Sequence, residues 1–172
     1  MTKSIIKAIA AIGVGMLVMV AWQRAASPAA AWEAELQLLN GRLADAIHAK
    51  DIDKIMACYQ NSDKLVVFDL IPPLQYKGWD SYKANWEGFL KQCTDAPTWD
   101  ESDLHFLGGQ TWAFSHSIVH MTCTMGQDKK MDIVLRVTNG YANFKGKWLI
   151  AHQHISVPVD PMTGKADLQS KP

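Results

Sequence analysis

The stretch Trp148-Leu149-Ile150-Ala151-His152-Gln153-His154-Ile155-Ser156-Val157-Pro158 indicates a β-strand near the C-terminus. It follows the turn-forming Lys145-Gly146-Lys147, is rich in β-branched and aromatic residues, contains no glycine and stops at a proline. Strand side chains alternate between two faces, so one face is predicted to carry Trp148, Ile150, His152, His154 and Ser156. The two imidazoles would lie about 7 Å apart. Because a buried polar group without a partner costs roughly 1–3 kcal/mol, this polar row is predicted to line a pocket.

Three more strands precede this one and are predicted to form an antiparallel meander with it. They span residues 99–107, 110–124 and 130–139, and the last strand spans 147–157. Turn-forming residues separate them at 108–109, at 126–128, and at Asn139-Gly140 together with Lys145-Gly146.

The first half of the mature chain is predicted to be mainly helical. Apolar residues recur at helical spacing over 32–49, and a short second helix follows Asp51, a natural N-cap. A strand over 64–69 stops at Pro72-Pro73, and a third helix starts near Asp80, carrying Tyr82, Trp86, Phe89 and Leu90. Segregated helices and an antiparallel sheet define an α+β fold, in which a strongly bent sheet wraps around three N-terminal helices and encloses a pocket.

The N-terminus has the features of a secretory signal peptide. Lys3 and Lys7 precede an uncharged apolar run over 8–22, and Ala29 and Ala31 occupy the positions of a small-residue cleavage site. We expect cleavage after Ala31, a folded domain over 32–158, and a loose tail over 159–172. The alternative is an uncleaved leader that anchors the protein to a membrane. Either way, the domain is predicted to be periplasmic or secreted.

The charge of the mature chain bears on its binding partners, and its cysteines bear on disulfide formation. Without residues 1–31 the chain keeps 14 Lys and Arg against 17 Asp and Glu, so its charge gives no reason to expect nucleic-acid binding. The three cysteines, Cys58, Cys93 and Cys123, are predicted to be mainly small buried apolar residues. One disulfide with one remaining thiol is the alternative in an oxidising compartment.

Motifs along the whole mature domain resemble those of the SnoaL-like branch of the nuclear transport factor 2-like superfamily, whose members share a cone-shaped α+β barrel with ketosteroid isomerase. The resemblance therefore implies that fold from about residue 32 to 158, but members differ too much in activity for it to imply a reaction. The motifs are Ala46-Ile47-x-Ala49-Lys50-Asp51-x-Asp53, Tyr59, Val67-Phe68-Asp69, Pro72-Pro73, Gly78-x-Asp80-x-Tyr82, Trp86, Arg136-Val137-Thr138-Asn139, Gly146-Lys147-Trp148 and His152-x-His154-x-Ser156-x-Pro158.

The comparison with ketosteroid isomerase assigns a candidate base but not its partners. The general-base aspartate of that family corresponds to Asp69. The helix tyrosine of its oxyanion hole falls at Leu43, and its second oxyanion acid falls near Ile133, with Asp132 pointing to the other face. A base without these donors lacks the largest usual catalytic contribution, so steroid isomerisation by that mechanism is excluded.

Several side chains are candidates for the pocket. Asp69, at a strand end, is the candidate base, with His152 and His154 as proton donors or substrate-orienting groups. Each candidate also has a structural alternative: a turn cap or an ion pair with Arg136 for Asp69, a satisfied structural pair for the histidines, and core packing for the aromatic residues. The candidate ligand-binding residues are Arg136, Tyr82, Trp86, Trp79, Trp148, His120 and Ser156.

No metal or cofactor is predicted. A His-x-His pair can bind a metal from one side, but a zinc site needs a third ligand, and nothing in the spacing shows that His120 or Asp69 supplies it. The sequence has no GxSxG, HExxH, GxGxxG or phosphate-loop motif.

Two functions stay open. One is acid/base chemistry of the lyase, isomerase or hydrolase type on a small organic molecule. The other is a non-catalytic ligand-binding or dimerisation module, with a homodimer formed through the outer sheet face, where Leu149, Ala151, Ile155 and Val157 are predicted to lie.

Overall fold

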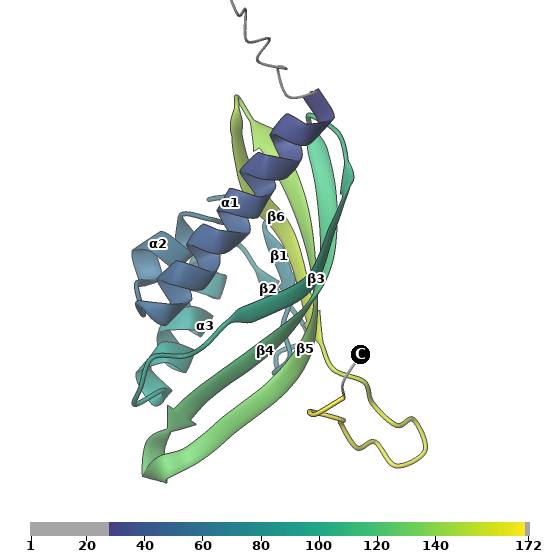
Figure 1. The fold of residues 1–172 in the computed structure, drawn as a ribbon. Helices are drawn as coiled ribbons and strands as arrows, with labels where there is room; N and C mark the ends of the chain where they lie inside the picture. Colours follow the sequence, from purple (N-terminus) through teal and green to yellow (C-terminus); the bar gives the residue numbers. More distant parts are fainter. Residues whose placement is uncertain (1–27, 171–172) are drawn as a thin grey trace, which may run out of the picture.

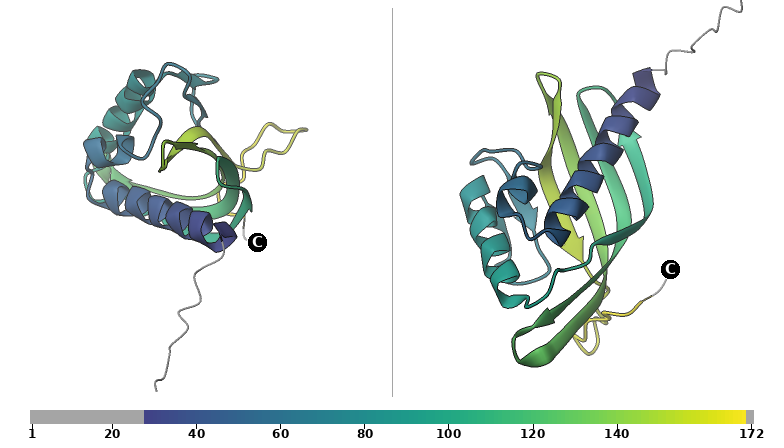
Figure 2. Two further views of the ribbon diagram at one scale, coloured as in Figure 1. Left: turned by 90° about the horizontal axis from the view of Figure 1, so that it is seen from above. Right: turned by 60° about the vertical axis from the view of Figure 1, so that its left-hand side comes forward.

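The computed structural model describes residues 28–170, and these form one curved sheet with three helices on its concave side (Figures 1 and 2). The elements follow the chain in this order: α1 (Pro28–His48), α2 (Ile52–Met56), β1 (Val66–Phe68), β2 (Tyr76–Lys77), α3 (Trp79–Gln92), β3 (Asp100–Gly108), β4 (Trp112–Met125), a 3-10 turn (Gly126–Asp128), β5 (Lys129–Phe144) and β6 (Lys147–Ser156). The predicted α+β class and the sheet bent around the helices are confirmed. The predicted leader lies outside the described residues apart from 28–31.

The sheet has the order β2-β1-β6-β5-β4-β3 and does not close. Strands β3 to β6 form the predicted antiparallel meander. Strand β1 adds to β6 in parallel, with Val66 opposite His152 and Phe68 opposite His154, so the sheet is mixed. Strand β2 pairs with β1, and the sequence analysis did not predict it.

The helices cover the concave face with their apolar sides. Helix α1 runs diagonally across the sheet, while α2 and α3 cover its lower part (Figure 1). Leu36, Leu39, Leu43 and Ile47 of α1 are fully buried, as the spacing predicts. Asp51 caps α2, because its side chain accepts a 3.0 Å hydrogen bond from Lys54 N.

A β-bulge in β6 changes the predicted faces of that strand. Gly140 lies opposite His152, but the next residue, Tyr141, lies opposite Ile150, so Ala151 is an extra residue without a partner. Trp148 and Ile150 therefore point inward as predicted, whereas beyond the bulge Gln153, Ile155 and Val157 are the buried residues. The prediction that His152, His154 and Ser156 share the inward face is wrong for this reason.

The residues Asn139 and Gly140 are not a turn. They lie within β5, and the turn to β6 is at Lys145 and Gly146, both at positive φ. Gly140 instead accommodates the bulge, because a Cβ at this position would approach the Cβ of His152 to 3.4 Å.

The C-terminal segment, which we expected to be loose, packs back on the sheet. Asp167 N donates to Pro158 O and Val134 N donates to Leu168 O, each at 2.8 Å. The segment thus lies beside the part of β5 that extends past the end of β6. Within residues 28–170, no helix is long and apolar enough to cross a membrane.

Candidate functional site

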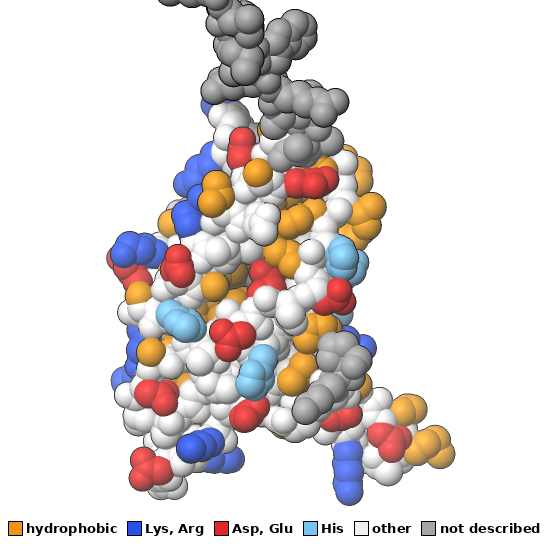
Figure 3. Space-filling view, viewed as in Figure 1, with side chains coloured by type: hydrophobic (Ala, Val, Ile, Leu, Met, Phe, Trp, Pro, Cys, Tyr) orange, Lys and Arg blue, Asp and Glu red, His pale blue; other side chains and the backbone are white. Residues whose placement is uncertain are grey.

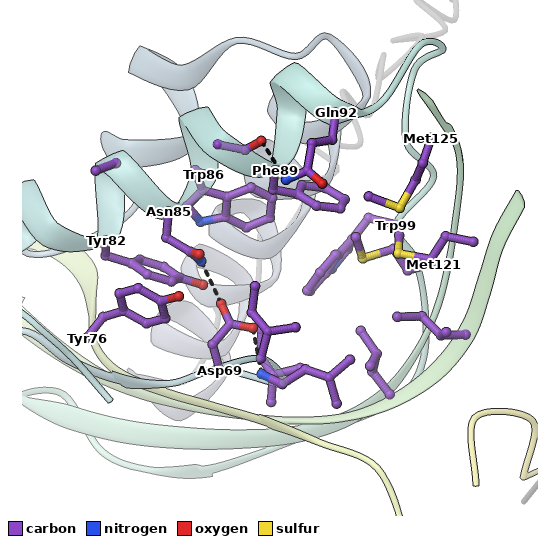
Figure 4. Close-up of a pocket in the computed structure, with 18 of the residues that line it drawn as sticks. Asp69, Tyr76, Tyr82, Asn85, Trp86, Phe89, Gln92, Trp99, Met121 and Met125 are labelled. Carbon is purple, nitrogen blue, oxygen red and sulfur yellow. Dashed lines mark hydrogen bonds between the residues drawn. The ribbon is translucent and has the colours of Figure 1, made fainter. Parts of the chain in front are cut away.

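A cavity of about 590 Å³ lies between α3 and the lower part of the sheet (Figure 4). Helix α3 contributes one wall, the loop after β1 contributes the floor, and β4, β5 and β6 contribute the opposite wall. Most of its lining is apolar, with aromatic rings on the helix side and methionines on the strand side. The main lining residues are Asp69, Leu70, Tyr76, Tyr82, Asn85, Trp86, Phe89, Gln92, Trp99, Met121, Met125, Met131, Ile133, Leu135 and Ile155.

Asp69 provides the polar end of the cavity. Its Oδ2 accepts a 2.9 Å hydrogen bond from Asn85 Nδ2, and its Oδ1 accepts a 2.6 Å bond from Leu70 N. Burial raises the pKa of Asp69, although the hydrogen bonds from Leu70 and Asn85 partly counteract this effect. Of the described residues that line the cavity, Asp69 alone carries a formal charge.

The tyrosines behind Asp69 belong to a buried polar network. Tyr82 Oη and Tyr59 Oη both donate to Gln153 Oε1, at 2.9 and 3.0 Å, and Gln153 Nε2 donates to Asn139 Oδ1 at 2.8 Å. Gln153 and Tyr82 are completely buried. Because Gln153 fixes the orientation of Tyr82, the network holds this wall of the cavity rigid.

Three of the predicted pocket residues do line this cavity: Asp69, Tyr82 and Trp86. Tyr82 and Trp86 lie one helical turn apart on α3, with ring centroids 6.1 Å apart. The Trp86 indole nitrogen is buried, and it is the one buried side-chain polar atom in residues 28–170 for which no hydrogen-bond partner is found.

His152 and His154 lie on the outer face of the sheet, away from the cavity. His152 Nδ1 lies 2.8 Å from Val66 O, and both rings contact Phe68 edge-on, with centroids 5.2 and 5.7 Å away. His154 and Ser156 line a second, more open hollow of about 710 Å³ beside the C-terminal segment. Asp69 borders it too, yet no hydrogen bond joins these three side chains among the described residues.

Arg136 and His120 are also on the outer face. Arg136 Nη2 donates to Val157 O at 2.8 Å, so the ion pair with Asp69 that the sequence suggested does not form. His120 Nε2 lies 2.9 Å from Asp132 Oδ1. Both side chains therefore stabilise the sheet surface and do not contribute to the cavity.

Trp79 and Trp148 pack elsewhere in the core. Trp79 Nε1 donates to Met56 O at 3.0 Å, joining α3 to α2. Trp148 is buried at the upper end of the sheet with its ring centroid 6.5 Å from that of Trp32. Neither residue lines the cavity.

The sequence analysis missed most of the cavity wall. Asn85 could have been found, because it lies three residues after Tyr82 and four before Phe89, on the same side of α3. The methionines carry no such signal, since Met121, Met125 and Met131 alternate as any inward strand residues do.

The geometry agrees with the exclusion of a ketosteroid isomerase mechanism. Leu43 is buried in the core, Ile133 offers only an apolar side chain to the cavity, and Asp132 points outward to His120. No group of three or more potential metal ligands is found among the described residues.

An open curved sheet with three helices on its concave side defines the class of cone-shaped α+β folds. The SnoaL-like domain model matches residues 36–160, and the chain belongs to this family. A search among curated proteins finds no match.

Solved structures have the same fold. An NTF2-like protein of unknown function from Pseudomonas putida KT2440 is 34% identical over 83% of this chain and 97% of its own, with a TM-score of 0.72. An NTF2-like superfamily protein from Salmonella enterica is 15% identical over 81% and 99%, with a TM-score of 0.71. A ketosteroid isomerase-like protein from Erwinia carotovora is 17% identical over 72% and 93%, with a TM-score of 0.61. The last two likenesses show the fold alone.

Proposed function

We propose that this is an exported protein that binds a small, uncharged, largely apolar organic molecule in the cavity between α3 and the sheet, and that Asp69 performs acid/base chemistry on it. The observation that carries the proposal is a single half-buried carboxyl at the end of a largely apolar cavity of about 590 Å³. Apolar walls with a few polar groups are typical of small-molecule sites.

The environment of Asp69 suits proton transfer. Burial raises its pKa above the ordinary value, which makes the carboxylate a stronger base. Asn85 and Leu70 N hold the carboxyl in one orientation, so little reorganisation accompanies the reaction. The reaction type is a lyase, isomerase or hydrolase step that begins with proton abstraction.

The Trp86 indole N–H gives a second reason to expect a polar atom on the ligand. A buried donor without a partner costs roughly 1–3 kcal/mol. A ligand oxygen that accepts a hydrogen bond from this N–H would remove this cost. The preferred ligand therefore combines an apolar body with an acceptor oxygen.

Native mass spectrometry of protein purified from its own host tests the proposal first, by identifying the bound molecule. That molecule is then supplied to the wild type and to Asp69→Asn, which keeps the size of the side chain and removes its ability to take a proton. We expect Asp69→Asn to bind the molecule and to lose turnover by at least about 100-fold.

Asp128→Asn is the matched control, because Asp128 lies at positive φ in the β4–β5 turn, where asparagine is tolerated, and outside the cavity. Unchanged turnover in Asp69→Asn would contradict the catalytic role and leave a binding function. An empty cavity in protein from the host would contradict both.

The second candidate function is a homodimer formed through the outer sheet face. Large apolar side chains are exposed there in adjacent strands, among them Leu107 opposite Phe114, and Trp112 with 63% exposure. Figure 3 shows hydrophobic side chains gathered at the upper right, over the β3–β4 turn. An exposed apolar patch on a sheet suits self-association, and a second copy with the same patch is the proposed partner.

The residues of this face differ from those predicted. Ile155 and Val157 are buried inside because of the bulge, whereas Leu149 does point outward, opposite Ala142. The large exposed apolar side chains of the outer face therefore lie mainly on β3 and β4.

A further inference from the structure

Two of the three cysteines lie together beside the cavity. Cys93 follows the last residue of α3 and forms an isolated antiparallel bridge with Met125 of β4. Cys123 lies two residues before Met125, so its side chain points to the same side of β4. Both cysteines are buried, with 3% and 4% exposure, and neither belongs to the main hydrophobic cluster. They form a separate buried pair.

The backbone around the pair is held firmly. Thr94 N donates to Thr124 O at 2.7 Å, and Thr98 N donates to Thr122 O at 2.8 Å. The Asp95 carboxylate accepts bonds from both Thr124 N and Thr124 Oγ1, each 2.7 Å long. The segment after α3 therefore continues along β4 as a further strand-like contact, and the cysteines cannot drift apart without breaking it.

Cys58 has a different environment. It follows α2, and its Sγ donates to Lys54 O at 3.5 Å. Burial raises its pKa to about 11. Cys58 shares no strand pairing with the other two cysteines, which makes it a natural internal control.

We propose that Cys93 and Cys123 form a disulfide bond while the chain folds. Each thiol gives up its hydrogen, one sulfur–sulfur bond forms, and the two electrons and two protons pass to a disulfide oxidant, which becomes two thiols. Oxidised glutathione or a thiol–disulfide oxidoreductase is the class of oxidant required, and compartments outside the cytoplasm supply it.

The timing follows from burial. Burial and then a hydrogen bond with the Cys123 thiol raise the pKa of Cys93 to about 12, so Cys93 carries almost no thiolate at neutral pH in the folded protein. Exchange therefore takes place before the two side chains are buried, and the bond is afterwards protected from reductants.

The bond would fix one side of the cavity. Gln92, which precedes Cys93, and Met125, which pairs with it, both line the cavity. A covalent link between the end of α3 and β4 would hold these two walls at a constant separation. This inference does not depend on the identity of the ligand or on catalysis by Asp69.

The experiment is refolding of the whole chain from denaturant, in glutathione redox buffer and in reducing buffer, followed by alkylation and mass spectrometry. In the redox buffer we expect the wild type to lose two hydrogens, to retain one alkylatable thiol, and to yield a peptide pair that joins residues 93 and 123. We expect the oxidised form to melt higher by on the order of 10 °C.

The three single variants identify the partners. Cys58→Ala should form the bond and leave no alkylatable thiol, whereas Cys93→Ala and Cys123→Ala should form none. The peptide map of the wild type decides the question even if a variant does not fold. Three alkylatable thiols in the oxidised wild type, or a bond that includes Cys58, would overturn the proposal.

Discussion

At the scale of single residues, Asp69 makes the stability of the protein depend on pH. Its pKa is raised in the folded state above the ordinary 3.8. The folded state therefore binds this proton more tightly than the unfolded chain. The contribution of Asp69 to stability is most favourable below pH 3.8 and is lost as the pH rises through the raised pKa.

Asp69→Asn removes this dependence. At pH 7 we expect its Tm to equal or exceed that of the wild type, because the variant no longer buries a charge. As the pH is lowered, the Tm difference between variant and wild type should shrink. Thermal unfolding at several pH values measures it, and a variant that melts well below the wild type at pH 7 would show that Asp69 is a structural carboxylate.

Gln153 and His154 are adjacent, and replacing each with leucine tests which one faces the core. Gln153→Leu removes the acceptor of the Tyr59 and Tyr82 hydroxyls and the donor to Asn139 Oδ1, so we expect a loss of about 2–4 kcal/mol in the free energy of unfolding. His154→Leu changes an exposed residue and should cost less than about 0.5 kcal/mol. Chemical denaturation measures both, and the reverse order would place the bulge elsewhere.

At the scale of elements, the strand β6 shows how far the sequence determines the site. Its existence, its ends and its neighbour β5 follow from turn residues and β-propensity. The faces do not, because one extra residue at Ala151 reverses every side chain beyond it. Gly140 was the available signal, since a glycine inside a strand often marks a bulge, but beside Asn139 it equally suggests a turn.

For helix α3, in contrast to β6, the sequence predicts correctly which side chains share the inward face. Its apolar spacing predicts Tyr82 and Trp86 on one face, and both line the cavity. The partner wall could not be predicted, because the residues that approach α3 come from β4 and β5, and their distance from the helix depends on the bend of the sheet. The spacing within one element predicts which side chains share a face, but it does not predict which residues pack against that face.

Gly88 of α3 and Gly41 of α1 form a matched pair for testing the cavity. Both lie inside helices, and a Cβ at either position meets no atom within 4 Å. Gly88 lines the cavity and Gly41 does not. Replacement of either by alanine should stabilise the protein by about 0.5–1 kcal/mol.

Larger side chains at these positions should separate packing from binding. We expect Gly88→Phe to fill part of the cavity and to weaken ligand binding at least tenfold, and Gly41→Phe to leave binding unchanged. Titration calorimetry with the molecule identified by native mass spectrometry measures both. Equal affinity in the two variants would show that the ligand binds in another part of the protein.

At the scale of the whole molecule, the exposed outer face predicts a dimer. Trp112→Glu places a charge in the proposed interface, and we expect it to convert a dimer to a monomer at micromolar concentration. Leu38→Glu is the control, because Leu38 of α1 has a similar exposure, 64%, and lies on a different surface. Light scattering measures the molar mass of the wild type and both variants, and a monomeric wild type at this concentration would contradict the proposed interface.

The C-terminal segment has a consequence for the lifetime of the protein in solution. The first half of β5 extends past the end of β6, and without the hydrogen bond between Val134 N and Leu168 O its backbone would be an open edge. Open edges recruit strands from other molecules and seed insoluble assemblies. Residues 160–170 thus cover this edge, and we expect a chain that lacks them to aggregate faster than the full-length chain.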